Sequence, residues 1–159
     1  MADARIFQDL KADHDRHRAM LAELAAANFD DRAELFEALR IEISAHAAAE
    51  EESLYATMLA NPDLRDEARH SVSEHKEVDD FFGELVELNA ASAEWTAKFG
   101  EMRHRYEHHI DEEEEEMFPA AAAELSDDEE ERLADVFEDR KPKELERAEH
   151  EPAGGDQRD

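Results

Sequence analysis

Cysteine is absent from the 159 residues of this chain. Its absence excludes disulfide bonds, thiolate metal sites and iron–sulfur clusters held by the chain's own thiols. No apolar run approaches the roughly 18 residues that a membrane-spanning helix requires. The opening residues, MADARIFQDLKADHD, also lack the apolar stretch of a secretory signal peptide. These absences and the chain length predict a cytoplasmic protein of one domain.

Basic residues are scarce as well, with 18 Lys and Arg against 46 Asp and Glu and a formal net charge of −28. A surface this acidic repels nucleic acid and anionic membranes, and it attracts cations. We therefore expect neither nucleic acid nor a membrane among the partners. The sequence identifies no protein partner.

Glycine and proline, which interrupt helices, occur only four times each. Elsewhere apolar residues recur at steps of three and four, which is the spacing of one face of a helix. Short connections between such helices favour antiparallel neighbours. The sequence thus predicts an all-α, up-down-up-down four-helix bundle with helices over residues 6–24, 35–54, 68–86 and 95–117.

The C-terminal part is expected to add little to this bundle. The capping-box pattern of Ser126 and Glu129 predicts a short fifth helix that runs through Phe137. Apolar residues then nearly vanish, so residues 141–159 are predicted to form a disordered acidic tail whose removal costs little stability. The bundle domain is accordingly assigned to residues 1–140.

Two segments of the chain repeat one another. His46 is followed four residues later by Glu50, and His109 is followed at the same spacing by Glu113. A histidine preceded by an acidic residue stands upstream of each copy, as Asp13-His14 and as Glu74-His75. This pattern indicates a duplicated helical hairpin that carries metal ligands.

Side chains able to bind metal fall on the apolar faces of the predicted helices: His14, His17, His46, Glu50, His75, Asp79, His109 and Glu113. A buried ionised carboxylate is costly unless it is paired or bound to a cation, and no Lys or Arg shares the faces of Glu50 and Glu113. Nitrogen and oxygen ligands without sulfur suit iron, manganese or zinc. Six or more ligands indicate two ions. His104 and His108 lie on the opposite side of their helix and are interpreted as surface residues.

These motifs, ending in Met117-Phe118-Pro119, resemble the hemerythrin-like domain, also called the HHE cation-binding domain, over roughly residues 5–140. The resemblance implies a four-helix bundle with two non-haem iron ions bridged by Glu50 and Glu113. It also implies a role in binding or sensing oxygen, nitric oxide, peroxide or iron. The residues that match family ligands are His14, His46, Glu50, His75, His109 and Glu113.

The sequence departs from the oxygen-carrying members of that family at two positions. Carriers have two histidines four residues apart on the third helix, whereas here His75 has Asp79 four residues after it and Ser71 four residues before it. Carriers also have an aspartate five residues after the last histidine, whereas here Glu113 follows His109 by four. Reversible oxygen carriage is therefore not expected. His17 and Asp79 stay open, either as additional ligands or as groups that hydrogen-bond a ligand.

Three classes of function fit the sequence. The first is a di-iron protein that binds or senses a small diatomic ligand or peroxide. The second is an enzyme, either a ferroxidase or an oxidase that consumes peroxide, which needs open coordination positions. The third is a metal-free acidic helical interaction protein. Whether there is turnover stays open, and Tyr55, Tyr106 and Trp95 are expected to be core residues.

Overall fold

The computed structural model describes residues 3–151, and all regular secondary structure in that range is helical, which confirms the all-α prediction. None of these helices is both long and apolar enough to cross a membrane. The α-helices are α1 (Arg5–Ala26), α2 (Arg32–Glu50), α3 (Ala56–Ala60), α4 (Arg65–Val86), α5 (Ala93–Glu112), α6 (Phe118–Glu124) and α7 (Asp127–His150). The shorter helical turns are a 3-10 turn, Phe29–Asp31, and two π-helical turns, Glu51–Tyr55 and Glu113–Met117.

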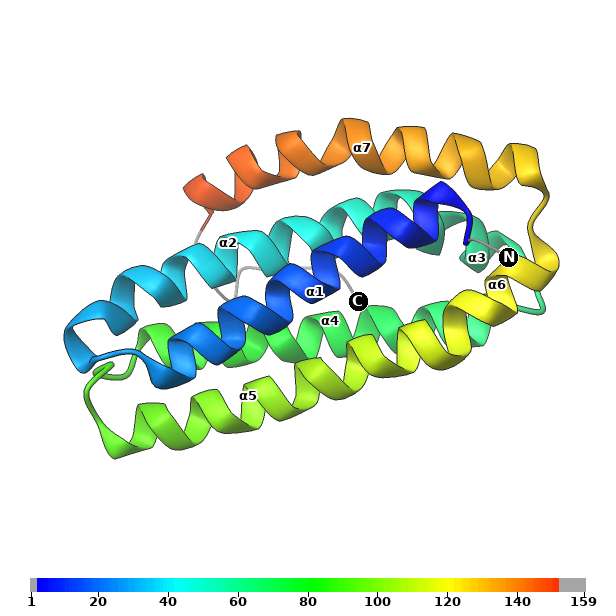
Figure 1. The fold of residues 1–159 in the computed structure, drawn as a ribbon. Helices are drawn as coiled ribbons and strands as arrows, with labels where there is room; N and C mark the ends of the chain where they lie inside the picture. The colour runs from blue at the N-terminus through cyan, green and yellow to red at the C-terminus, as the bar shows by residue number, and fades with distance from the viewer. Residues whose placement is uncertain (1–2, 152–159) are drawn as a thin grey trace.

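Four long helices, α1, α2, α4 and α5, run lengthwise beside one another (Figure 1). α1 packs against α2, and α4 packs against α5, with further contacts from α1 to α5 and from α2 to α4. Ser92 accepts a hydrogen bond from the backbone N–H of Trp95 and so caps the start of α5. Ser126 and Glu129 form the predicted capping box at the start of α7. α5 and α7 therefore begin where the sequence supplies a side-chain cap.

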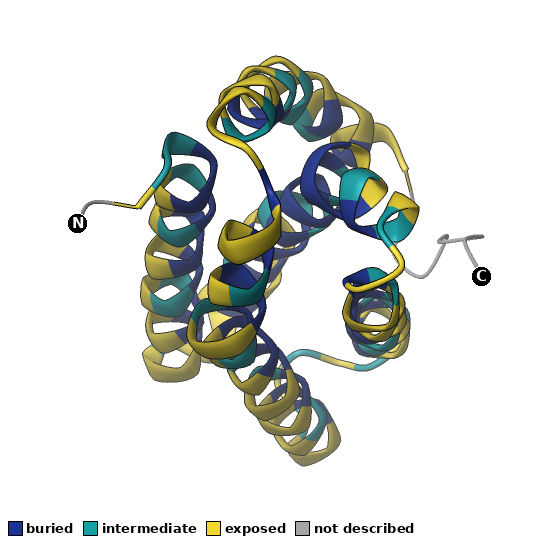
Figure 2. Cartoon of the chain, turned by 90° about the vertical axis from the view of Figure 1, so that its right-hand side faces the viewer, coloured by how far each residue is buried: buried dark blue, intermediate teal, exposed yellow. Residues whose placement is uncertain are grey.

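The apolar core is divided into two clusters along the length of the four helices. One cluster includes Ile6, Leu10, Leu54, Met58, Ala68, Met117 and Phe118, and the other includes Leu21, Leu39, Val78, Phe82, Trp95 and Met102. The buried sides of the helices face the interior (Figure 2). On each long helix the inward histidines and glutamates lie between the two clusters, as His14 lies between Leu10 and Leu21. A polar layer therefore crosses the core at one depth.

The C-terminal helix is longer than predicted. α7 continues to His150, so the prediction of disorder is wrong for residues 141–151, and the predicted domain boundary at residue 140 falls inside a helix. The rest of the predicted tail, residues 152–159, lies outside the described residues. α7 packs lengthwise against α2 and α1 (Figure 1).

The attachment of this last part of α7 depends on few apolar atoms, which is why the apolar pattern does not reveal it. Ala148 is buried against the bundle. The ammonium group of Lys141 lies 2.8 Å from an oxygen of Asp13 and 2.8 Å from an oxygen of Glu42. Pro142 lies inside the helix although it lacks an N–H to donate. Partly buried ion pairs thus replace the usual apolar stripe.

Truncation of the chain after Arg140 is expected to lower the melting temperature by about 5 °C relative to truncation after Glu151. Truncation after Arg140 removes Ala148 and leaves Asp13 and Glu42 without Lys141, which costs roughly 1–2 kcal/mol of stability. Each kcal/mol corresponds to about 2–4 °C in the melting temperature of a domain of this size. Thermal unfolding followed by circular dichroism measures the difference. Equal melting temperatures would show that the end of α7 contributes nothing to stability.

Candidate metal centre

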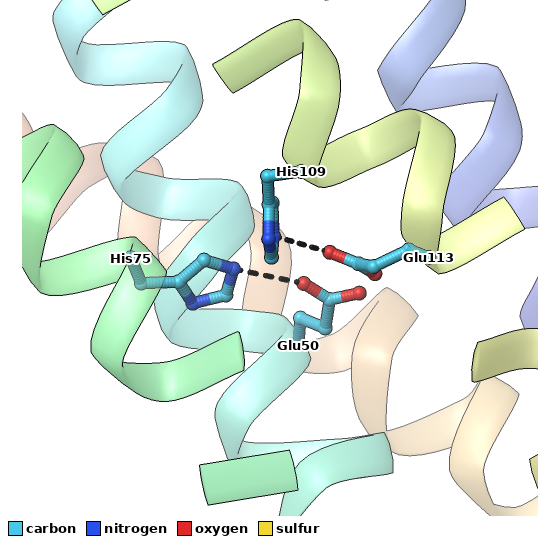
Figure 3. A group of neighbouring side chains, drawn as sticks. All are labelled: Glu50, His75, His109 and Glu113. Carbon is cyan, nitrogen blue, oxygen red and sulfur yellow. Dashed lines mark ion pairs between the residues drawn. The ribbon is translucent and has the colours of Figure 1, made fainter. Parts of the chain in front are cut away.

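Six buried side chains from the four long helices and the second π-turn meet in the polar layer. A first group has its ligating atoms within 4.8 Å of one another and consists of Glu50, His75, His109 and Glu113 (Figure 3). A second group on the same criterion consists of His14, His46 and Glu50. Glu50 belongs to both groups. The structure therefore brings together all six residues that the sequence assigned as principal ligands.

The contacts within this layer join imidazole nitrogens to carboxylate oxygens. His75 Nε2 lies 3.2 Å from Glu50 Oε1, and His46 Nε2 lies 3.6 Å from the same oxygen. His109 Nε2 lies 2.5 Å from Glu113 Oε1. None of these side chains is more than 5% exposed. One glutamate thus contacts imidazoles from both halves of the repeat.

The other nitrogen of each imidazole is held by a carboxylate. The Nδ1 pairs are His14 with Glu114 at 2.7 Å, His46 with Asp13 at 2.8 Å, His75 with Glu51 at 2.8 Å and His109 with Glu74 at 2.8 Å. Because a carboxylate accepts, each pair assigns the proton to Nδ1 and leaves a lone pair on Nε2, directed into the layer. Metal-binding histidines are commonly oriented in this way.

The atoms that face the centre of the layer are buried and lack hydrogen-bond partners: Nε2 of His14, His46 and His109, and both carboxylate oxygens of Glu50 and Glu113. Each buried unsatisfied group costs roughly 1–3 kcal/mol. Imidazole lone pairs and carboxylates that face one another also repel. Only a proton or a cation relieves this repulsion, so the residues fit a metal centre.

The sequence analysis did not identify these supporting carboxylates as partners of the ligands, although the repeat contains the signal. Asp13 precedes His14 and accepts a hydrogen bond from His46. In the same way, Glu74 precedes His75 and accepts a hydrogen bond from His109. Glu51 and Glu114 follow the two inward glutamates and hold histidines of the opposite hairpin. An acidic neighbour beside each ligand is the pattern that predicts them.

Two π-helical turns coincide with the repeated motif. The turn Glu51–Tyr55 begins directly after Glu50, and the turn Glu113–Met117 begins at the second inward glutamate. π-turns occur mostly as isolated turns inside α-helices and often at functional sites. Their repetition within one residue of equivalent positions indicates that the wider turn belongs to the geometry of the centre.

Residues 5–121 match the hemerythrin HHE cation-binding domain. This chain belongs to that family. A crystal structure of a hemerythrin HHE cation-binding domain-containing protein from Mycobacterium kansasii has the same fold, with a TM-score of 0.78 and 23% identity over 92% of this chain and 90% of that chain. No significant match was found among curated proteins. The resemblance predicted from the paired motif is thus confirmed.

The two open candidates, His17 and Asp79, occupy different places in this HHE domain. His17 is buried, but its Nδ1 accepts a hydrogen bond from the hydroxyl of Tyr106 at 2.7 Å, and its Nε2 lies 3.3 Å from Glu42. Both ring nitrogens therefore have partners in the protein, although His17 also forms a third group of possible ligands with Asp13 and His46. Asp79 is half-buried and lines a small cavity beside His75, outside the ligating groups found among residues 3–151.

The burial of the remaining histidines and of two tyrosines tests the other predictions from the sequence. His104 and His108 are exposed, as predicted. Tyr55 and Tyr106 are core residues, but their polar ends belong to the HHE centre. The ring of Tyr55 stacks on His75 with centroids 5.3 Å apart, and its buried hydroxyl has no hydrogen-bond partner. The helical phase and the assignment of Tyr55 and Tyr106 to the core are therefore confirmed.

Without a cation, the HHE centre retains protons. Burial and the neighbouring Glu113 raise the pKa of Glu50 well above its usual range. Burial disfavours the charged form of His109, but Glu113 and Glu74 outweigh it and raise the pKa of His109 to about 9. For His46, burial prevails and lowers the pKa to about 3, despite the contact with Asp13. Metal binding must therefore displace protons from the group formed by Glu50, His75, His109 and Glu113.

Metal affinity is expected to increase as the pH rises from about 7 to about 9. His109 is protonated below its raised pKa of about 9, and a cation binds only the neutral ring, so fewer protons are displaced at higher pH. Competition with a chromophoric chelator measures the affinity, and proton release in weak buffer gives an independent count. An affinity independent of pH over this range would contradict the assignment.

Replacing Asp13 with asparagine is expected to weaken metal binding by about 10- to 100-fold without removing any ligand. The charge that orients His46 and favours its binding to a cation is lost, while the amide still fills the space. The matched control is Asp15→Asn, because Asp15 is exposed and two residues away. Equal affinities for the two variants would show that the contact between Asp13 and His46 is irrelevant to the centre.

Proposed function

We propose that this HHE domain holds two non-haem iron ions and binds or senses a small ligand such as oxygen, nitric oxide or peroxide. The observation that carries the proposal is the position of Glu50 in both ligating groups, which suits a carboxylate shared by two ions. The proposed ligands are His14, His46, Glu50, His75, His109 and Glu113. The pairing of α1 with α2 and of α4 with α5 supports an up-down-up-down bundle as their frame.

Iron is proposed among the metals that suit this donor set because it fits the proposed binding of small ligands. Four imidazoles and two carboxylates without a thiolate are typical of iron, manganese or zinc sites, and bound iron supplies redox chemistry and affinity for small ligands. These residues offer four nitrogens and four carboxylate oxygens, which is fewer donors than two six-coordinate ions take up. Positions for an exogenous ligand are therefore part of the proposal.

The size of the adjoining space supports a small ligand. A cavity of about 40 Å³ lies beside His75 and is lined by Ile43, Phe82 and Tyr106 among others. A cavity needs roughly 10–15 Å³ of such volume to hold one water molecule. The cavity thus has room for a diatomic molecule or peroxide beside His75.

The decisive experiment exposes the reduced, iron-loaded protein to oxygen, nitric oxide and peroxide in turn, and follows visible absorption and peroxide concentration. We expect saturable absorption changes with each ligand. The change with oxygen should not reverse under argon, because neither Asp79 nor Ser71, four residues after and before His75, supplies the second histidine of an oxygen carrier. Sustained disappearance of peroxide would favour the enzymatic alternative, and reversal under argon would favour an oxygen carrier. The absence of any spectral response would overturn the proposal.

A further inference from the structure

A second cavity connects the protein surface with the buried layer. It has a volume of about 250 Å³ and lies between α4 and α5. Its lining includes His70, Glu74 and Glu112, and two ligands of the proposed centre, His109 and Glu113, also line it. Nε2 of His109 and both carboxylate oxygens of Glu113 are buried without hydrogen-bond partners. The cavity therefore borders two residues whose inward atoms are buried and lack hydrogen-bond partners.

Three side chains along this cavity form a candidate cation site of their own. His70, Glu74 and Glu112 have their ligating atoms within 4.8 Å of one another. His70 Nε2 lies 3.4 Å from Glu74 Oε1 and 3.8 Å from Glu112 Oε1. Exposure of the side chain falls from 59% for His70 to 34% for Glu112 and 6% for Glu74. The group thus leads from solvent into the interior.

The innermost member of this group also contacts the centre. Glu74 Oε1, which faces His70, accepts the hydrogen bond from His109 Nδ1 at 2.8 Å. A cation held by Glu74 is therefore one residue away from the proposed ligands. Glu74 belongs to both sites, as a ligand in the cavity and as the group that orients His109.

The charges around the cavity favour a divalent cation. Its lining contains five carboxylates, those of Asp66, Glu67, Glu74, Glu112 and Glu116 besides the buried Glu113, and neither lysine nor arginine. A cleft of one charge sign concentrates counter-ions and raises their rate of entry. The side of the layer covered by α7 differs, because Lys141 and Arg16 already neutralise Asp13 and Glu42 there.

We propose that this cavity is the entry site through which a divalent cation reaches the buried centre, with His70, Glu74 and Glu112 as its first ligands. The inference rests on the proposed metal centre and adds the route by which that centre is filled. The site would bind a hydrated divalent ion, and its imidazole and carboxylate groups would replace part of the ion's water shell. Glu74 then passes the ion to His109 and Glu113.

Stopped-flow mixing of metal-free protein with Co²⁺ tests the route, because cobalt bound by nitrogen and oxygen ligands absorbs visible light. The double variant His70→Ala, Glu112→Gln should take up cobalt about tenfold more slowly than the wild type, with the same final stoichiometry. Added salt should slow the wild type more than the variant, because the variant has lost part of the attracting charge.

The matched control is the double variant His104→Ala, Glu115→Gln, which makes the same chemical changes at exposed positions outside the cavity. The control should load at the wild-type rate. Equal rates for both double variants, with full loading, would overturn the entry route and leave the centre intact. A lower final stoichiometry in the His70 and Glu112 variant would also overturn it, because these residues would then belong to the centre. Failure of the wild type to bind cobalt would overturn both proposals.

Discussion

Replacement of Glu50 by alanine is expected to abolish iron binding. Glu50 is fully buried, belongs to both ligating groups and contacts imidazoles from α2 and α4. Its loss removes the shared carboxylate and opens the layer to water, so neither ion keeps a complete set of ligands. Iron content after purification and after reconstitution measures the effect. The control is His108→Ala, which changes an exposed residue adjacent to His109 and should retain full iron. Retention of iron by the Glu50 variant would contradict the shared-ligand assignment.

A second substitution at this position separates function from stability. Glu50→Met fills a similar volume without a buried carboxyl group, and it leaves the contact between His109 and Glu113 in place. The metal-free form of this variant is expected to be more stable than metal-free wild type by about 1–3 kcal/mol, although it cannot bind iron. A destabilised variant would indicate that Glu50 serves the fold and not a metal.

Removal of the metal is expected to lower the melting temperature by about 10 °C or more. A ligand present at about 1,000 times its Kd adds roughly 4 kcal/mol, and each kcal/mol corresponds to about 2–4 °C in a domain of this size. In the metal-free protein the inward nitrogens of His14 and His46 are buried without a hydrogen-bond partner, and His109 and Glu50 retain protons that a cation would displace. Differential scanning calorimetry before and after chelation measures the change.

Restoring Fe²⁺ to the stripped protein should return the original melting temperature, whereas Mg²⁺, which prefers oxygen ligands and keeps much of its water, should not. If stripped and loaded protein unfold at the same temperature, the polar layer is satisfied without metal. The acidic interaction protein considered from the sequence would then be the better account.

The helices and the six inward residues were predictable because both depend on a local period. Apolar residues at steps of three and four define a buried face, and any histidine or glutamate in phase with that face is buried with it. The repeat of His46 and Glu50 as His109 and Glu113 then removed the ambiguity of a single buried histidine. Burial of all six in one layer agrees with that phase.

Other features were not predictable because they depend on contacts between distant segments. The last turns of α7 have too few apolar residues to show a period, and Lys141 attaches them through Asp13 and Glu42. The π-turns change the helical repeat only where the centre requires it. His70 lies on the exposed side of α4, so its approach to Glu112 on α5 emerges only from the packing of the two helices.

The most direct test of the central claim is elemental analysis of the protein purified after growth with iron, combined with Mössbauer spectroscopy of ⁵⁷Fe-enriched protein. Two iron ions per chain, magnetically coupled through a shared ligand, are the predicted result, because Glu50 lies in both ligating groups. One zinc ion per chain, isolated uncoupled iron, or no metal after iron supplementation would contradict the dinuclear centre.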